Sequence, residues 1–204
     1  MSNSKIDIKS MNLAELTEFV ASIGEKAFRA KQLYQWLHVK QVYAFDDMTN
    51  LSKAFREKLD EVSFITDLKQ EQVQISQIDG TRKYLFLLED GNVIESVLMR
   101  YKHGNSVCIS SQVGCRMGCR FCASTLDGLV RGLRPSEMID QIYKIGQDIG
   151  ERISNVVVMG TGEPMDNYDN LLKFITLLTD ENGLNISQRN LTVSTCGIVP
   201  RMRQ

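Results

Sequence analysis

The chain has 204 residues, 43% of them hydrophobic, and its 24 Lys+Arg against 25 Asp+Glu give a formal net charge of −1. That hydrophobic fraction excludes wholesale disorder, and the near-zero charge predicts no general affinity for polyanions. No apolar run approaches the ~20 residues of a membrane-spanning helix, and the opening MSNSKIDIKSMN lacks the apolar stretch of a secretory signal. We therefore expect no membrane partner and a cytoplasmic location, where five cysteines serve thiolate chemistry or metal binding rather than disulfides.

Residues 1–62 are predicted to form a small helical accessory domain. Asn12 followed by Glu15 is a capping-box pattern, and apolar residues at helical spacing continue from there to about residue 24. Similar patterns predict a second helix over about 27–38 and a third over about 51–62. Three short helices with short connections favour a packed bundle.

Residues 63–100 are predicted to form a connecting β-meander. Apolar and polar residues alternate there, which is the period of a half-buried strand. Asp79-Gly80 and Asp90-Gly91 are hairpin turn signals that divide the segment. The expected strands run over about 72–78, 81–88 and 93–99.

Residues 101–204 alternate between strand and helix patterns. This alternation is typical of a parallel α/β layer, so the predicted fold class is α/β. The expected order is a strand at 107–111, a cysteine-rich loop, a helix capped by Ser136, a strand at 155–159, a helix at 168–179 and a strand at 191–195.

The strongest chemical signal is the loop that holds Cys115, Cys119 and Cys122 in a C-x3-C-x2-C spacing. Three thiolates on one loop select zinc or an iron–sulfur centre. Three ligands suit a four-iron cluster in which one iron has no protein ligand. A structural zinc site needs four ligands, so a zinc site would require a further one. The candidates for it are Cys108, Cys196 and His103.

A second motif, Gly160-Thr161-Gly162-Glu163-Pro164, directly follows the apolar strand. It is not a dinucleotide-binding fingerprint, because Met165 stands where the third glycine is needed. The glycines by themselves predict only a turn. A carboxylate at the carboxyl end of a strand, however, suits an ammonium partner.

These motifs resemble those of known proteins. The cysteine spacing, with aromatic Phe121 before the last cysteine, resembles the signature of the radical S-adenosylmethionine (SAM) superfamily. The chain is more specifically similar to the RNA adenine methyltransferases of the RlmN and Cfr type, and to their RlmN branch in its N-terminal region. The resemblance extends over nearly the whole chain, and several strings match in order: GEKAFRAKQLYQWL, FDDMTNLSK, VCISSQVGC, MGTGEPMDN and VSTCGIVP.

The resemblance implies roles for matching positions. Cys115, Cys119 and Cys122 would hold a [4Fe–4S] cluster, and Gly162, Glu163 and Ser194 would contact SAM. Glu95 matches the family's proposed proton acceptor, and Cys108 matches a second catalytic cysteine that helps to resolve a covalent protein–RNA adduct. Without the resemblance, Glu95 is interpreted as a charged residue on the wet face of a strand and Cys108 as a small buried hydrophobe. Cys196 stands where relatives usually carry serine, so we interpret it as non-catalytic.

The resemblance also implies the reaction. One SAM methylates a cysteine near the C-terminus, and a second yields a 5′-deoxyadenosyl radical that takes a hydrogen atom from that methyl group. The resulting methylene radical adds to C2 of adenine, which is too electron-poor for ordinary methyl transfer, and proton loss and thiolate attack release methyladenosine. The family's six-strand partial (β/α) barrel would be truncated here after about three strands, and the methyl-carrying cysteine would lie beyond residue 204. We therefore expect an N-terminal fragment that is inactive alone.

The implied partners are 23S rRNA, tRNA and a small electron-donor protein such as flavodoxin or ferredoxin. Two alternatives stay open: a zinc-stabilised, non-catalytic RNA-binding module, and an adenine-C8 methyltransferase of the same family. Charge offers modest support for RNA, because residues 99–134 carry six basic side chains and only one acidic side chain. Those basic residues are Arg100, Lys102, Arg116, Arg120, Arg131 and Arg134, and Lys26, Arg29 and Lys31 are further candidates.

Overall fold

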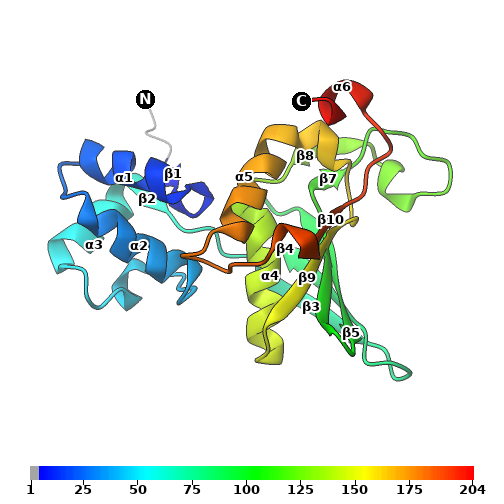
Figure 1. The fold of residues 1–204 in the computed structure, drawn as a ribbon, viewed down its shortest axis with the longest axis horizontal. Helices are drawn as coiled ribbons and strands as arrows, with labels where there is room; N and C mark the ends of the chain where they lie inside the picture. The colour runs from blue at the N-terminus through cyan, green and yellow to red at the C-terminus, as the bar shows by residue number, and fades with distance from the viewer. Residues whose placement is uncertain (1–4) are drawn as a thin grey trace.

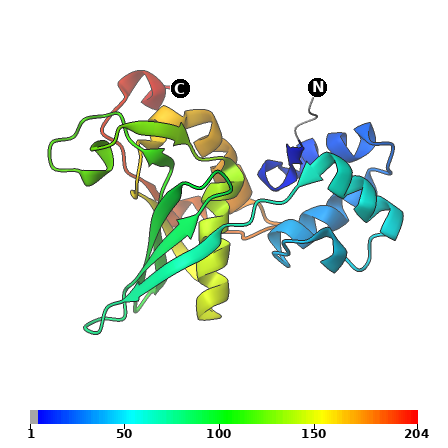
Figure 2. The same cartoon turned by 180° about the vertical axis from the view of Figure 1, so that it is seen from behind.

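The computed structural model describes residues 5–204, so residues 1–4 of the predicted accessory domain lie outside the described residues. Figures 1 and 2 show a helical region on one side and an α/β region on the other. The helical region holds three helices, as predicted: α1 (Leu13–Ser22), α2 (Phe28–His38) and α3 (Lys53–Val62). The short strands β1 (Ile6–Asp7) and β2 (Ser63–Phe64), which have no clear sequence signal, pair in parallel and close the region.

Local sequence sets the ends of these helices. The capping box at the start of α1 is confirmed: Asn12 accepts a hydrogen bond from the Glu15 amide at 2.9 Å, and Glu15 accepts one from the Asn12 amide at 2.9 Å. Ser52 caps α3 by accepting from the Phe55 amide. The apolar faces of the helices then pack into a continuous core, in which Leu16, Leu33, Leu37 and Leu59 are fully buried.

The predicted meander and the predicted α/β layer share one six-stranded sheet. Strands β3 to β6 pair antiparallel, whereas β6, β9 and β10 pair in parallel. Strand β10 forms one edge of the sheet, and β3 forms the other. In sheet order the strands are β10 (Leu191–Val193), β9 (Ile153–Val158), β6 (Gly104–Ile109), β5 (Val93–Tyr101), β4 (Arg82–Leu87) and β3 (Lys69–Ile75).

Helices α4 (Pro135–Ile149) and α5 (Tyr168–Thr179) cover one face of this sheet and pack against each other (Figure 1). Alternate residues of β4 and β5, such as Tyr84, Phe86 and Ile94, are buried beneath them. The residues between them face the opposite side. We call this side the open face, and define it by Lys83, Glu95, Val97, Cys108 and Val157.

Smaller elements complete the chain. The hairpin of β7 (Gln112–Gly114) and β8 (Leu129–Gly132) carries the cysteine loop at its tip, beside α6 (Val199–Met202) (Figure 1). The 3-10 helices are Ile8–Ser10, Phe45–Asp47, Ala123–Thr125, Pro164–Asn167 and Gln188–Asn190. Within residues 5–204, no helix has both the length and the apolar character needed to cross a bilayer.

The prediction that Ser136 caps α4 is wrong. Proline favours the first position of a helix, so α4 begins at Pro135 and Ser136 lies in its first turn. Ser136 is fully buried instead, where its hydroxyl donates to Asp7 at 2.5 Å and its amide donates to Ser10 at 3.0 Å. The start of α4 is thereby joined to the N-terminal segment.

A buried ion pair fixes the helical region to α4. The side chains of Lys9 and Asp140 are both completely buried and in contact. The Lys9 ammonium also donates to the Thr66 carbonyl at 3.0 Å, and Asp140 accepts from Tyr43 and from the Leu68 amide. Burial lowers the pKa of Lys9, while the Asp140 carboxylate opposes that shift. Because every charged atom has partners, the pair is tolerated in the interior.

Replacement of Lys9 by methionine tests this attachment. The change strands the Asp140 carboxylate without its cation, so we expect the free energy of unfolding to fall by about 3–5 kcal/mol in urea titrations followed by circular dichroism. Lys53, whose pair with Glu57 is 81% exposed on the lysine side, provides the control, and Lys53→Met should cost less than about 1 kcal/mol. Equal costs for the two variants would contradict the proposed attachment.

Histidine 38 lies beneath the same contact. The residue is 1% exposed, its ring lies tilted against Tyr34 with the centroids 4.4 Å apart, and it shares a 2.9 Å hydrogen bond with the Tyr143 hydroxyl. Burial, with a smaller contribution from Lys9, lowers the pKa of His38 to about 3. The folded chain therefore keeps this ring neutral, while the unfolded chain takes up a proton below the ordinary pKa of 6.5.

The unfolded state binds more protons between the two pKa values, so stability falls as pH falls, by about 2 kcal/mol from about pH 7 to about pH 5. Urea unfolding at the two pH values measures this fall. His38→Gln should remove most of it, whereas His103→Gln, which changes the other, exposed histidine, should leave it in place. An unchanged fall in His38→Gln would contradict the assignment.

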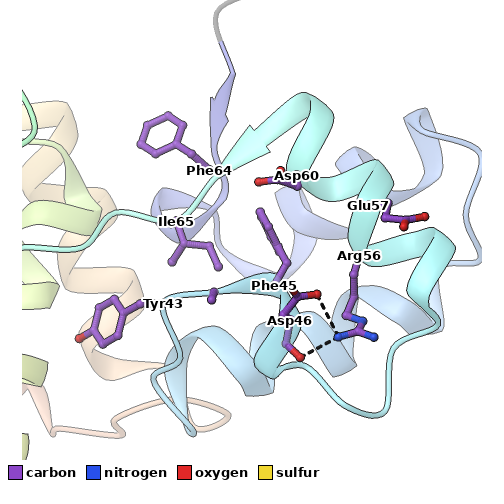
Figure 3. A pocket seen from close by; sticks show the side chains of 9 residues that line it. Tyr43, Phe45, Asp46, Arg56, Glu57, Asp60, Phe64 and Ile65 are labelled. Atoms are coloured by element: carbon purple, nitrogen blue, oxygen red, sulfur yellow. Dashed lines mark hydrogen bonds and ion pairs between the residues drawn. The ribbon is translucent and has the colours of Figure 1, made fainter.

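A cavity of about 460 Å³ lies in the helical region, between α3 and the segment that leads to β3 (Figure 3). Arg56 closes one side of it by donating to the Asp46 carbonyl at 2.7 Å and to the Asp46 carboxylate at 3.2 Å. The remaining lining mixes aromatic rings with exposed carboxylates, including Asp60, and none of the predicted cluster, SAM-binding or catalytic residues lies in it.

Candidate functional site

The three cysteines of the C-x3-C-x2-C motif lie on the tip of the β7–β8 hairpin and line one cavity of about 210 Å³. The hairpin is pinned where the loop begins, because the Cys115 amide donates to the Gly128 carbonyl at 2.9 Å. Inside the loop, the Cys122 amide donates to the Cys119 carbonyl at 3.1 Å. Cys115 is buried, and Cys119 and Cys122 are half-buried.

The opposite wall of the cavity comes from the loops that follow β9 and β10. Gly160, Gly162 and Glu163 follow β9, and Ser194 with the next two residues follows β10. The structure therefore brings the predicted cluster ligands together with all three predicted SAM contacts. Phe121 also lines the cavity and is 96% exposed.

Glu163 is the most constrained group in this wall, since the residue is only 3% exposed. Its carboxylate accepts hydrogen bonds from the Met165 amide at 2.9 Å, the Thr195 hydroxyl at 2.6 Å and the Cys196 amide at 2.7 Å. Burial alone would raise the pKa of Glu163, but these donors outweigh it and lower the pKa below its ordinary value. Glu163 is therefore a buried, ionised carboxylate.

The Cys196 thiol also donates to Glu163, and this contact raises the pKa of Cys196 to about 11. A carboxylate offers about four lone-pair sites, and three of them are taken by the donors of Met165, Thr195 and the Cys196 amide. A thiol is a weak donor, so it holds the fourth site only weakly. This fourth site is the one that a ligand's ammonium group can occupy. Cys196, which the sequence interprets as non-catalytic, lines the cavity.

Glycine is required at residue 162. Its φ is +107°, and a Cβ there would lie 2.5 Å from the Gln112 Cβ and 2.7 Å from the Gln112 backbone nitrogen. The Gln112 amide oxygen in turn accepts from the Glu163 amide at 2.8 Å. Gln112 thus holds the Gly162–Glu163 turn against the base of the cysteine hairpin. Neither Gln112 nor Thr195 was singled out from the sequence, because each acts through a contact distant along the chain.

Cys108 and Glu95 lie outside this cavity, on the open face. The Cys108 thiol accepts a hydrogen bond from the backbone of Met159, which lines the cavity, and burial raises the pKa of Cys108. The Glu95 carboxylate forms an ion pair with Lys83 at 2.8 Å. The structure therefore places Cys108 beside the cavity and Glu95 one strand further away.

Most of the expected positive charge around the cysteine loop is neutralised. Arg100, Arg116, Arg131 and Arg134 each form ion pairs with carboxylates from outside residues 99–134. Only Lys102 and Arg120 among the six have no ion-pair partner within residues 5–204. The sequence count of charges therefore overstated the basic character of this face.

Comparison with known proteins decides the family. Residues 6–65 match the family model described as "Ribosomal RNA large subunit methyltransferase N-terminal domain", and residues 109–204 match that of the "Radical SAM superfamily". A "Probable dual-specificity RNA methyltransferase RlmN" of Lachnospira eligens is 68% identical over 198 residues, which cover 97% of this chain and 57% of that protein. This chain belongs to the RlmN family of radical SAM proteins.

Other relatives agree with this placement. A protein of the same description from Lachnoclostridium phytofermentans is 64% identical over 202 residues, covering 98% of this chain and 56% of that protein. The crystal structure of a radical SAM methyltransferase from Sphaerobacter thermophilus superposes with a TM-score of 0.87 at 38% identity, covering 96% of this chain and 58% of that chain. The chain therefore spans a little over half the length of the relatives that it matches.

Radical SAM proteins use a [4Fe–4S] cluster and SAM, and the residues of this RlmN-family chain fit both groups. A cluster binds each thiolate to a different iron, so its ligands surround a common cavity, as Cys115, Cys119 and Cys122 do. Among residues 5–204, no three His, Cys, Asp or Glu side chains converge tightly enough to hold a single metal ion. The ionised Glu163 in the facing wall suits the amino group of SAM.

Replacement of Gly162 by alanine tests the turn that carries Glu163. We expect the free energy of unfolding to fall by about 2–5 kcal/mol, because left-handed strain of about 1–2 kcal/mol adds to overpacking of about 1–3 kcal/mol against Gln112. Gly91 has a φ of +83°, and a Cβ added there would meet nothing within 4 Å, so Gly91→Ala isolates the backbone strain. Equal losses in the two variants, measured by urea unfolding, would show that the contact with Gln112 is unimportant.

Proposed function

We propose that this chain forms the cofactor-binding part of an RlmN-type radical SAM methyltransferase that methylates C2 of an adenosine in 23S rRNA and in tRNA. The observation that carries the proposal is the shared cavity, in which three thiols face an ionised, buried carboxylate. The chain spans 57% of the length of its Lachnospira eligens relative, so the activity is proposed for the whole protein.

In this proposal, Cys115, Cys119 and Cys122 hold the [4Fe–4S] cluster. When bound, the cluster supplies the electron that cleaves SAM reductively. Glu163 receives the amino group of SAM in place of the Cys196 thiol, and Gly162, which also lines the cavity, contacts SAM beside it. Ser194 contributes from the β10 side of the cavity, where its amide donates to the Val158 carbonyl at 3.0 Å.

The open face carries the remaining proposed roles. Glu95 accepts the proton lost from adenine C2, and Cys108 helps to resolve the covalent adduct between protein and RNA. Burial raises the pKa of Cys108, so its thiol is mostly protonated at neutral pH and must lose that proton before it attacks. Both residues lie on strands rather than loops, which holds their separation constant.

The partners and the organisation are proposals of the same kind. Substrate RNA would meet the accessory domain of residues 1–62 and the core of residues 101–204, with the meander of residues 63–100 between them. Reduction of the cluster calls for a small electron-donor protein such as flavodoxin or ferredoxin. We place the protein in the cytoplasm, because ribosomal and transfer RNA are located there.

Anaerobic reconstitution of the chain with iron and sulfide tests the cluster assignment. We expect about four irons per chain and an EPR signal after reduction that changes when SAM is added. Cys119→Ala should lose the cluster, because a thiolate ligand is removed, whereas Cys196→Ala should keep its iron content. One bound zinc without iron would overturn the proposal in favour of a zinc-stabilised RNA-binding module.

The position of methylation needs the whole protein. We propose a chimera in which these 204 residues are joined, at the matching position, to the remainder of the Lachnospira eligens relative. Mass spectrometry of adenosines from RNA treated with the reconstituted chimera should find 2-methyladenosine. Finding 8-methyladenosine instead would assign the chain to the C8 branch of the family.

A further inference from the structure

One ion pair on the open face joins Lys83, which has no role in the proposed mechanism, to Glu95, the proposed proton acceptor. The Lys83 ammonium lies 2.8 Å from the Glu95 carboxylate, and the side chains are 40% and 50% exposed. In the β4–β5 register Leu85 is opposite Glu95 and Lys83 is opposite Val97, so Lys83 and Glu95 are diagonal neighbours on one face. The pair is therefore held by sheet geometry rather than by a flexible loop.

The same register leads from this pair to the cofactor cavity. Val97 is opposite Cys108 on β6, and Cys108 is opposite Val157 on β9, so all of these side chains share the open face. Cys108 accepts its hydrogen bond from the backbone of Met159, which lines the cavity of the cysteines. Lys83, Glu95 and Cys108 thus lie on three successive strands that approach the cavity.

The surroundings leave Lys83 as the group that orients the Glu95 side chain. The Ser110 hydroxyl donates to the Glu95 backbone carbonyl at 2.7 Å and fixes the main chain there. Within residues 5–204, the Glu95 carboxylate has no other ion-pair partner. An exposed pair of this kind contributes only about 0–1 kcal/mol to folding, so stability alone gives little reason for it.

We propose that Lys83 is a positioning residue for Glu95: its ammonium group holds the carboxylate aimed across the open face toward the adenine of the bound RNA. This inference rests on the proposed function, because it needs Glu95 to act as the proton acceptor. It adds no chemical step, since Lys83 exchanges no atom with the substrate. A neutral side chain at residue 83 would leave the carboxylate free to rotate away from the substrate.

The contact itself is tested on this chain without any cofactor. A water-soluble carbodiimide activates a carboxylate and joins it to an amine in contact, forming an amide while the elements of water pass to the carbodiimide. Mass spectrometry of the digested protein should find Lys83 linked to Glu95, and Glu95→Gln should abolish this link. Lys173 and Glu15, which also lie 2.8 Å apart at similar exposure, provide a positive control. A control link without the Lys83–Glu95 link would overturn the inference.

The role in catalysis is tested in the reconstituted chimera described above. Lys83→Met should lower kcat by about 10–100-fold with the KM for RNA unchanged, and should increase the fraction of protein trapped as a covalent RNA adduct. Lys83→Arg, which keeps the charge, should restore most of the activity. Lys173→Met, which breaks the matched pair away from the open face, should leave kcat unchanged.

The outcomes separate the inference from the function on which it rests. If the parent chimera binds a cluster but forms no methyladenosine, the proposed function fails, while the carbodiimide link still reports the geometry. If the parent chimera is active and Lys83→Met retains its kcat, only the positioning role fails. A rise in KM with an unchanged kcat would mean that Lys83 contacts RNA instead, and would also overturn the inference.

Discussion

The parallel pairing of β6, β9 and β10 is the constraint from which the rest of the site follows. Parallel strands present their carboxyl ends at one edge of a sheet, so the segments that leave all three strands emerge together. The cysteine hairpin follows β6, the Glu163 turn follows β9, and Ser194 with Thr195 follows β10. Three segments distant in sequence thereby enclose one cavity. A shift of register between β6 and β9 would separate the thiols from the carboxylate.

The charged groups of the chain serve different purposes according to their depth. Lys9 and Asp140 are fully buried and join the helical region to α4, and Glu163 is buried but kept ionised by neutral donors. Arg116 and Arg131 near the cysteine loop pair with Asp166 in the 3-10 helix Pro164–Asn167 and with Glu137 in α4, which ties the hairpin to these two helices. Lys83 and Glu95, by contrast, are half-exposed on the face that leads to the cavity, where a charged pair can still meet a ligand.

Sequence reasoning predicted the features that depend on local pattern. The capping box of Asn12 and Glu15, the three helices, the order of strands and helices after residue 101, and the cysteine loop all follow from short-range spacing. Local pattern did not predict three other features: the pairing of β1 with β2, the burial of Lys9 and the support of Glu163 by Thr195. Each of these depends on two segments far apart in the chain, and nothing in either segment alone indicates its partner.

The buried contact between Lys9 and Asp140 also limits how the molecule can work. A joint sealed by a desolvated ion pair cannot act as a hinge, because opening it would expose unpaired charges in a nonpolar interior. The helical region and the cavity are consequently held at a constant distance from each other. A ligand that spans both must match that distance, so any change of shape on binding has to come from the ligand itself.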